Sequence, residues 1–83
     1  MKFKAEIDVM PLKELLDPQG KAVGIGLSNI GLNAINNVRI GKHISVEIDA
    51  NDKAEAESKI KNACDKLLAN PVMEYYTFSI NPA

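Results

Sequence analysis

The sequence predicts an α+β domain, in which a small antiparallel sheet carries two helices on one of its faces. Two observations lead to this prediction. Apolar and polar residues alternate near the beginning, in the middle and near the end of the chain, as they do in half-buried strands. Between these segments lie two stretches with apolar residues at helical spacing and with capping residues at their starts. The resulting order, β-α-β-(β)-α-β, is that of a ferredoxin-like two-layer sandwich.

The length of 83 residues limits the chain to a single domain, residues 1–83. A chain of this size buries only about 60–65% of the surface that it exposes when unfolded, which is enough for one small core. We therefore expect a protein that gains stability from a partner or from copies of itself.

The composition argues against several classes of function. Ten Lys and Arg against eleven Asp and Glu give a net charge of −1, which disfavours binding to a nucleic-acid backbone. A single cysteine forms no intrachain disulfide, and the chain has no Cys/His set for a zinc site. There is no apolar run near 18 residues and no signal-peptide pattern. We expect a cytoplasmic chain that binds neither nucleic acid nor a membrane.

The first predicted element is a strand over residues 2–9, which ends before Pro11 because proline cannot donate to a strand ladder. Its alternation is strict, with the apolar residues Phe3, Ala5, Ile7 and Val9 on one face and the charged residues Lys2, Lys4, Glu6 and Asp8 on the other.

The second predicted element is a helix that begins at Asp17 and Pro18. The Asp17 carboxylate can cap the backbone N–H of Gln19 or Gly20, and proline suits the first helical position. Gly31 suits the left-handed conformation that ends many helices. The helix would bury one stripe, which consists of Ala22, Val23, Gly26, Leu27 and Ile30.

Residues 36–49 allow two interpretations, because their apolar residues all fall on even positions: Val38, Ile40, Ile44, Val46 and Ile48. A hairpin with a three-residue loop would pair Ile40 with Ile44, whereas a single long strand would bend at Gly41. We favour the long strand. It would exceed the usual 3–10 residues, so its ends should overhang the domain and pair with another chain.

The last two predicted elements are a helix and a strand. Asp52 and Glu55 form a capping-box-like helix start, and Asn70-Pro71 stops the helix. Its apolar stripe would consist of Ala56, Ile60, Ala63, Cys64, Leu67 and Leu68. The final strand runs from Val72 to Ile80, with Val72, Tyr76, Phe78 and Ile80 on one face.

The sequence shows no catalytic or metal-binding set. Cys64 falls on the apolar stripe of the second helix, which indicates a small buried hydrophobe. His43 is the sole histidine and is expected on the surface, because no orienting partner can be assigned to it. The pair Gly24 and Gly26 fails the G-x-G-x-x-G pattern, since position 29 is Asn.

Partner binding is the remaining possibility. Arg39 and Lys42 flank Gly41 and could meet an anion or an acidic partner, although ordinary edge charge explains them equally well. Residues 67–72 are too apolar for a free loop, which indicates either core closure or a contact surface. The candidate partner-binding residues are Asp17, Gln19, Arg39, Lys42, Asn70 and Glu74.

Three stretches, residues 16–20, 38–42 and 67–74, resemble in order and spacing the signature stretches of the PurS family. This family is the small subunit of phosphoribosylformylglycinamidine synthase, and the resemblance covers essentially the whole chain. Two departures are mild: Met73 stands where the family often has Ile, and Tyr75 where it often has an acid.

The resemblance implies a non-catalytic assembly subunit of this glutamine-dependent, ATP-using ligase, which performs the fourth step of purine synthesis. It implies a subunit that dimerises, bridges a large synthetase subunit and a glutaminase subunit and supports ammonia transfer between them. The small core and the long strand separately predict a dimer or dimer of dimers built by sheet continuation. ATP and magnesium would bind to the large subunit, so no cofactor is expected on this chain. Two other hypotheses are a stand-alone dimeric small-molecule-binding module of ferredoxin-like topology and a small enzyme that uses His43 or Cys64.

Overall fold

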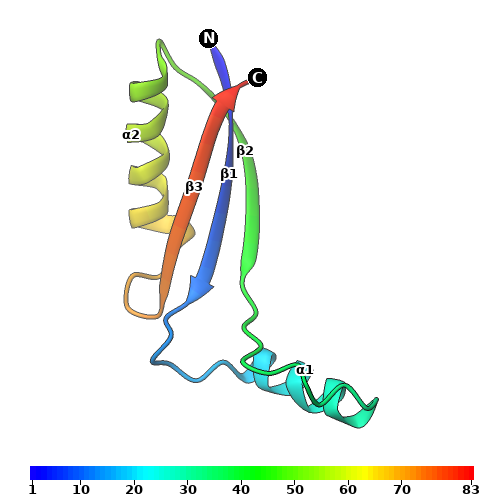
Figure 1. Cartoon of the computed structure of the whole chain (residues 1–83). Helices are drawn as coiled ribbons and strands as arrows, with labels where there is room; N and C mark the ends of the chain where they lie inside the picture. The colour runs from blue at the N-terminus through cyan, green and yellow to red at the C-terminus, as the bar shows by residue number, and fades with distance from the viewer.

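The computed structural model describes all 83 residues, and its strands form one antiparallel sheet in the order β2-β1-β3 (Figure 1). Neither helix has the length and apolarity that crossing a membrane requires. The elements, in chain order, are β1 (Lys2–Pro11), α1 (Pro18–Asn29), β2 (Lys42–Asp49), α2 (Lys53–Ala63), a π-helical turn (Cys64–Leu68) and β3 (Glu74–Pro82).

The core lies between the sheet and α2. The central strand β1 pairs with β2 on one side and with β3 on the other. Its predicted alternation is confirmed, because the side chains that point toward α2 are almost completely buried: Phe3, Ala5, Ile7 and Val9. On α2, Ala56 and Ile60 face this surface and complete the core together with Cys64, Ala50, Ala69 and Ile80.

The start of α2 agrees with the predicted cap. The backbone N–H of Glu55 donates to Asp52 Oδ1 at 2.8 Å, and Glu55 Oε2 accepts from the backbone N–H of Asn51 at 3.1 Å. The end of α2 differs from the prediction. The π-helical turn widens the helix after Ala63, and this changes which residues face the sheet. Leu67, expected in the buried stripe, is therefore 82% exposed.

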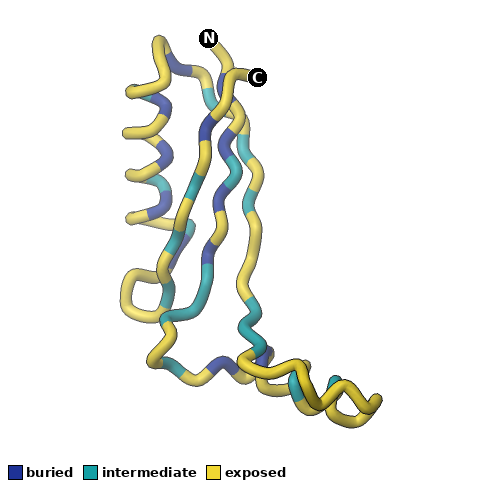
Figure 2. The backbone as a smooth tube through the Cα atoms, in the orientation of Figure 1, coloured by how far each residue is buried: buried dark blue, intermediate teal, exposed yellow.

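The placement of α1 corrects the predicted fold. The α+β class is confirmed, but only α2 covers the sheet, while α1 projects from its end (Figures 1 and 2). Of all α1 residues only Gly20 is buried, and the predicted apolar stripe is exposed except for the half-buried Leu27. The segments on both sides of α1 run past the end of the sheet, so the helix lies beyond the sheet and not on its face.

The two ends of α1 are nevertheless those that the sequence predicts. Asp17 is the N-cap and Pro18 is the first helical residue. Gly31 has φ +86°, and its N–H donates to Ser28 O while the N–H of Leu32 donates to Leu27 O. This pair of bonds is a Schellman motif. Local chemistry therefore determined where α1 begins and ends, but not what it packs against.

Residues 36–49 do not form a hairpin. All of β2 pairs with β1, and residues 36–41 continue away from the sheet toward α1. As the long-strand interpretation predicts, the chain does not reverse its direction within residues 36–49. The regular strand, however, begins only at Lys42. At Gly41 a side chain would collide with the carbonyl oxygen of Val9, which explains the glycine. Pairing of residues 36–41 with another chain stays a prediction. The last strand, β3, begins at Glu74, two residues later than expected.

Candidate functional site

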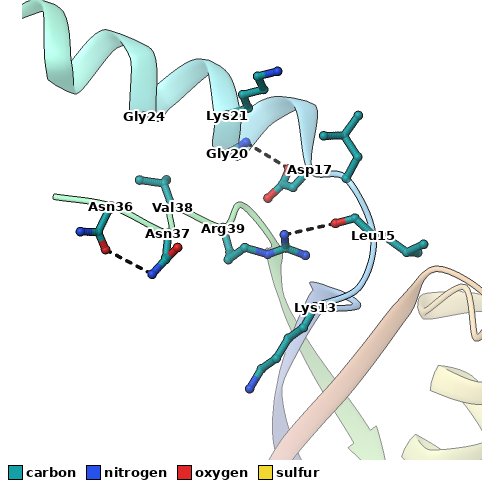
Figure 3. A pocket seen from close by; sticks show the side chains of 11 residues that line it. Lys13, Leu15, Asp17, Gly20, Lys21, Gly24, Asn36, Asn37, Val38 and Arg39 are labelled. Atoms are coloured by element: carbon teal, nitrogen blue, oxygen red, sulfur yellow. Dashed lines mark hydrogen bonds between the residues drawn. The ribbon is translucent and has the colours of Figure 1, made fainter.

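Most of the predicted partner-binding residues meet where α1 leaves the sheet. We call this region the α1 junction and define it as residues 11–20, 36–41 and 70–74. It contains two open cavities. One has a volume of about 780 Å³ and lies between the first turns of α1 and residues 36–39 (Figure 3). The other, of about 550 Å³, lies between the start of α1 and residues 70–74.

Asp17 joins the helix start to the chain that returns from α1. Its Oδ1 accepts from the backbone N–H of Gly20 at 3.0 Å, and its Oδ2 accepts from the backbone N–H of Ile40 at 2.8 Å. These two bonds, with Ile40 making the larger contribution, lower the pKa of Asp17 below its ordinary value. The side chain is buried, and its carboxylate caps α1 and also joins the helix start to Ile40.

Arg39 holds the connection between β1 and α1. Its guanidinium donates to the carbonyl oxygens of Leu12 at 2.6 Å, Leu15 at 3.3 Å and Pro11 at 3.4 Å (Figure 3 shows the bond to Leu15). Neither sequence interpretation, an anion contact or ordinary edge charge, included these bonds, and contact of Arg39 with a partner stays a prediction. The charge of Arg39 is directed at the backbone of its own chain, where it shapes the α1 junction.

Asn70 and Glu74 close the turn that precedes β3. Asn70 Oδ1 accepts from the backbone N–H of Val72 at 3.0 Å, and Glu74 Oε1 accepts from the backbone N–H of Asn70 at 2.8 Å. The N–H of Leu12 donates to Met73 O at 2.9 Å and so binds this turn to the end of β1. The polar residues of this stretch thus stabilise the turn, while Val72 (77% exposed) and Met73 (53% exposed) remain available for contact.

Gln19 and Lys42 complete the predicted set. Gln19 lines the 550 Å³ cavity together with Asp17, Asn70 and Glu74. Lys42 lines neither large cavity and is exposed at the start of β2, opposite Val9. The structure therefore brings five of the six predicted residues to the α1 junction and leaves Lys42 apart.

The open face of the sheet carries a polar cluster in which His43 has partners that the sequence did not assign to it. His43 is exposed, as expected, but its Nδ1 lies 2.7 Å from Asp8 Oδ1 and its Nε2 lies 2.5 Å from Glu6 Oε2. The hydrogen bonds to Asp8 and then to Glu6 raise the pKa of His43. The cluster follows from the register of β1 and β2, which places His43 directly opposite Asp8. The sequence alone did not determine this register.

The other residues of chemical interest have structural surroundings. Cys64 is completely buried, as expected, and burial raises the pKa of its thiol. The hydroxyl of Tyr76 donates to Asp65 at 2.7 Å, and Lys61 pairs with the same carboxylate at 2.9 Å. The structure places no group of three or more His, Cys, Asp or Glu side chains where they could hold a metal ion.

The fold and the α1 junction define a class of protein: a small α+β subunit whose polar residues shape the backbone and whose apolar residues remain exposed on α1 and beside β3. Residues 4–82 match the profile of the PurS family, described as phosphoribosylformylglycinamidine (FGAM) synthase. The chain belongs to this family, which confirms the resemblance drawn from its three signature stretches.

Individual relatives agree with this assignment. The chain is 46% identical over 78 residues to the phosphoribosylformylglycinamidine synthase subunit PurS of Synechocystis, which covers 94% of this chain and 78% of the relative. It is 36% identical over 78 residues to the Bacillus subtilis subunit, with 94% and 92% covered. Among solved structures it is similar to the PurS subunit of Thermotoga maritima, with a TM-score of 0.89, 33% identity and 98% and 93% covered. It is equally similar to a chain in the structure of PurLQS from the same organism, with 98% and 99% covered.

Proposed function

We propose that this chain is the non-catalytic assembly subunit of phosphoribosylformylglycinamidine synthase, an ATP-dependent ligase of purine biosynthesis. In this role it bridges a large synthetase subunit and a glutaminase subunit in the cytoplasm and supports ammonia transfer between them. ATP and magnesium bind to the large subunit. The observation that carries the proposal is the similarity over nearly the whole chain to a chain of the PurLQS assembly, at 33% identity.

The exposed surface supports a role in assembly. A compact protein of 9.0 kDa exposes roughly 4,900 Å². This chain exposes 5829 Å². The excess of roughly 900 Å² is close to the about 800 Å² per partner that a standard protein interface buries. The chain therefore exposes about one interface more than its size requires.

The distribution of this surface supports self-association. α2 covers β1 and β3, so the apolar residues of β2 on the same face, Ile44, Val46 and Ile48, are only half-buried. At the same time α1 exposes Val23 (43%), Ile25 (56%) and the adjoining Ile30 (70%). A second copy that lays its α1 on the β2 half of the sheet would complete the two-helix layer that the sequence predicts. Its residues 36–41 would then run beside the free edge of β2 and continue the sheet.

The deciding experiment is gel filtration of this chain with the large synthetase subunit, the glutaminase subunit and a glutamine analogue. We expect all three proteins to elute together as one complex. Elution of this chain apart from the other two, at concentrations where those two associate, would overturn the proposal. A rise in the melting temperature of the isolated chain with a small metabolite, without co-elution, would instead support a stand-alone binding module.

A further inference from the structure

The attachment of α1 to the rest of the chain is concentrated at the first turn of the helix. α1 makes no extensive contact with the sheet or with α2, and most of its apolar residues are exposed. At the helix start, the Asp17 carboxylate accepts from the backbone N–H groups of Gly20 at 3.0 Å and Ile40 at 2.8 Å. The direction of α1 is therefore set by how closely its first turn approaches the returning segment, residues 36–41 (Figure 3).

Gly20 lies where the helix start and the returning segment are in close contact. It is the only buried residue of α1. A Cβ atom added to it would collide with the carbonyl oxygen of Val38 and would lie only 2.6 Å from Asp17 Oδ2. Carbon atoms pack against their neighbours at about 3.5–4.0 Å, so both contacts would require movement. The Val38 oxygen belongs to the backbone and the Asp17 carboxylate is held by two bonds, so the helix start has to move.

The glycines in the interior of α1 are different. At Gly24 and Gly26 an added Cβ atom would meet nothing within 4 Å. Alanine favours a helix more than glycine does, so helix propensity explains none of the three glycines. Close approach of the backbone explains Gly20 alone.

We propose that Gly20 is a positioning residue, whose missing side chain fixes the angle at which α1 leaves the sheet. The angle directs the exposed apolar residues of α1, among them Val23, Ile25 and Ile30, within the assembly. This inference rests on the proposed function, because it gives the direction of α1 a role in assembly. Gly20 itself contacts no partner and acts only through the position of the helix.

The helix amplifies any displacement of its start. An α-helix rises about 1.5 Å per residue, so Gly20 lies roughly 4.5 Å and Asn29 roughly 18 Å from Asp17 along the axis. A tilt that moves Gly20 by about 1 Å therefore moves the end of the helix by about 4 Å. The cores of protein interfaces pack as densely as protein interiors, so Ile25 and Ile30 would no longer fit their contact surface.

Distances between spin labels, measured by electron paramagnetic resonance, test the direction of α1. One label is attached at Asn29→Cys, at the end of α1, and the other at Ser58→Cys on α2; both positions are exposed. The single native cysteine, Cys64, is completely buried, which protects it from the label. Labelled chain is diluted with unlabelled chain of the same sequence, so that only distances within one chain are recorded.

We expect Gly20→Ala to shift the mean distance by about 2–4 Å, since the end of the helix moves by several ångströms. Gly24→Ala is the matched control on the same helix. It raises helix propensity in the same way but meets no neighbouring atom, so it should keep the wild-type distance.

The consequence for assembly is measured by adding increasing amounts of the unlabelled chain to the large synthetase subunit and the glutaminase subunit. We expect Gly20→Ala to raise the concentration that gives half-maximal glutamine-dependent turnover at least roughly tenfold, because a misdirected helix has to be reoriented before it binds. Gly24→Ala should require the same concentration as the wild type.

An unchanged mean distance in Gly20→Ala would overturn the proposal, and so would a broader distribution around the same mean, which would show that Gly20 only stabilises the α1 junction. A shifted helix with the wild-type half-maximal concentration would overturn it too, since the direction of α1 would then be unimportant for assembly. Failure of the wild-type chain to co-elute with the other two subunits refutes the proposed function, and with it the role in assembly. The distance measurement on the isolated chain still decides whether Gly20 fixes the direction of α1.

Discussion

The sheet with α2 and the projecting helix α1 are two regions of similar apolar content and opposite burial. In the first, β1 places four apolar side chains in succession under α2, and each is at most 2% exposed. In the second, Val23, Ile25 and Ile30 are each at least 43% exposed. Both regions have well-formed caps and regular backbone. The difference shows that an apolar stripe predicts a surface suited to burial. The topology decides whether other elements of the same chain bury it.

The largest expected difference between the two regions lies in their contribution to the free energy of unfolding. Ile7→Ala, at a fully buried position of β1, should lower it by about 2–5 kcal/mol through lost burial and a cavity. Ile25→Ala, on exposed α1, should change it by less than about 0.5 kcal/mol at concentrations where the chain is monomeric. Urea unfolding of both variants measures the contrast. Equal losses would show that α1 is covered within its own chain.

A smaller effect is expected where the two regions join. Arg39→Glu removes the donors to three backbone carbonyls and places a negative group among them, so it should destabilise the α1 junction by about 1–3 kcal/mol. Thermal melting of the isolated chain should show this loss, and affinity for the large subunit should fall with it. Arg39→Lys keeps the charge but not the planar donor set, so its melting temperature should lie between those of the wild type and Arg39→Glu. Weaker binding at unchanged stability would show that Arg39 contacts the partner directly.

Asp17→Ala removes the cap of α1 and the acceptor for the N–H of Ile40, and should lower the melting temperature by about 4–8 °C. Asp17→Asn retains an acceptor oxygen and should lower it less. Because the folded-state pKa of Asp17 is lowered, its stabilising effect is present above its ordinary pKa and is lost as the pH falls through the folded pKa. The wild-type melting temperature should therefore converge with that of Asp17→Ala in acid. A constant difference between them at all pH values would show that the charge of Asp17 is unimportant.

The smallest effect concerns the open face of the sheet. The raised pKa of His43 means that its bonds to Asp8 and Glu6 stabilise the fold fully below the unfolded pKa of about 6.5. This stabilisation is lost as the pH rises through the higher folded value. An NMR titration of the imidazole should give a pKa above 6.5 in the wild type and a lower one in Asp8→Asn. Identical titrations would show that the cross-strand cluster does not persist in solution.

Several features could be predicted from the sequence because their causes are local. The alternation of β1, the caps at Asp17 and Asp52 and the left-handed Gly31 each depend on residues within a few positions of one another. The three signature stretches were likewise sufficient to identify the family. The candidate site was predicted as a set of residues, and five of its six members do meet at the α1 junction.

Only the tertiary structure decided the roles of these residues and the place of α1. Arg39 binds carbonyl oxygens 24 to 28 residues earlier in the chain, and His43 meets carboxylates 35 and 37 residues earlier. Such pairings follow from strand register and chain direction, which a hydrophobic pattern alone does not specify. The pattern of α1 predicts a helix with one buried face, whereas in this chain only Gly20 of α1 is buried. The segments on either side of it carry it beyond its own sheet, so within this chain its apolar residues stay exposed.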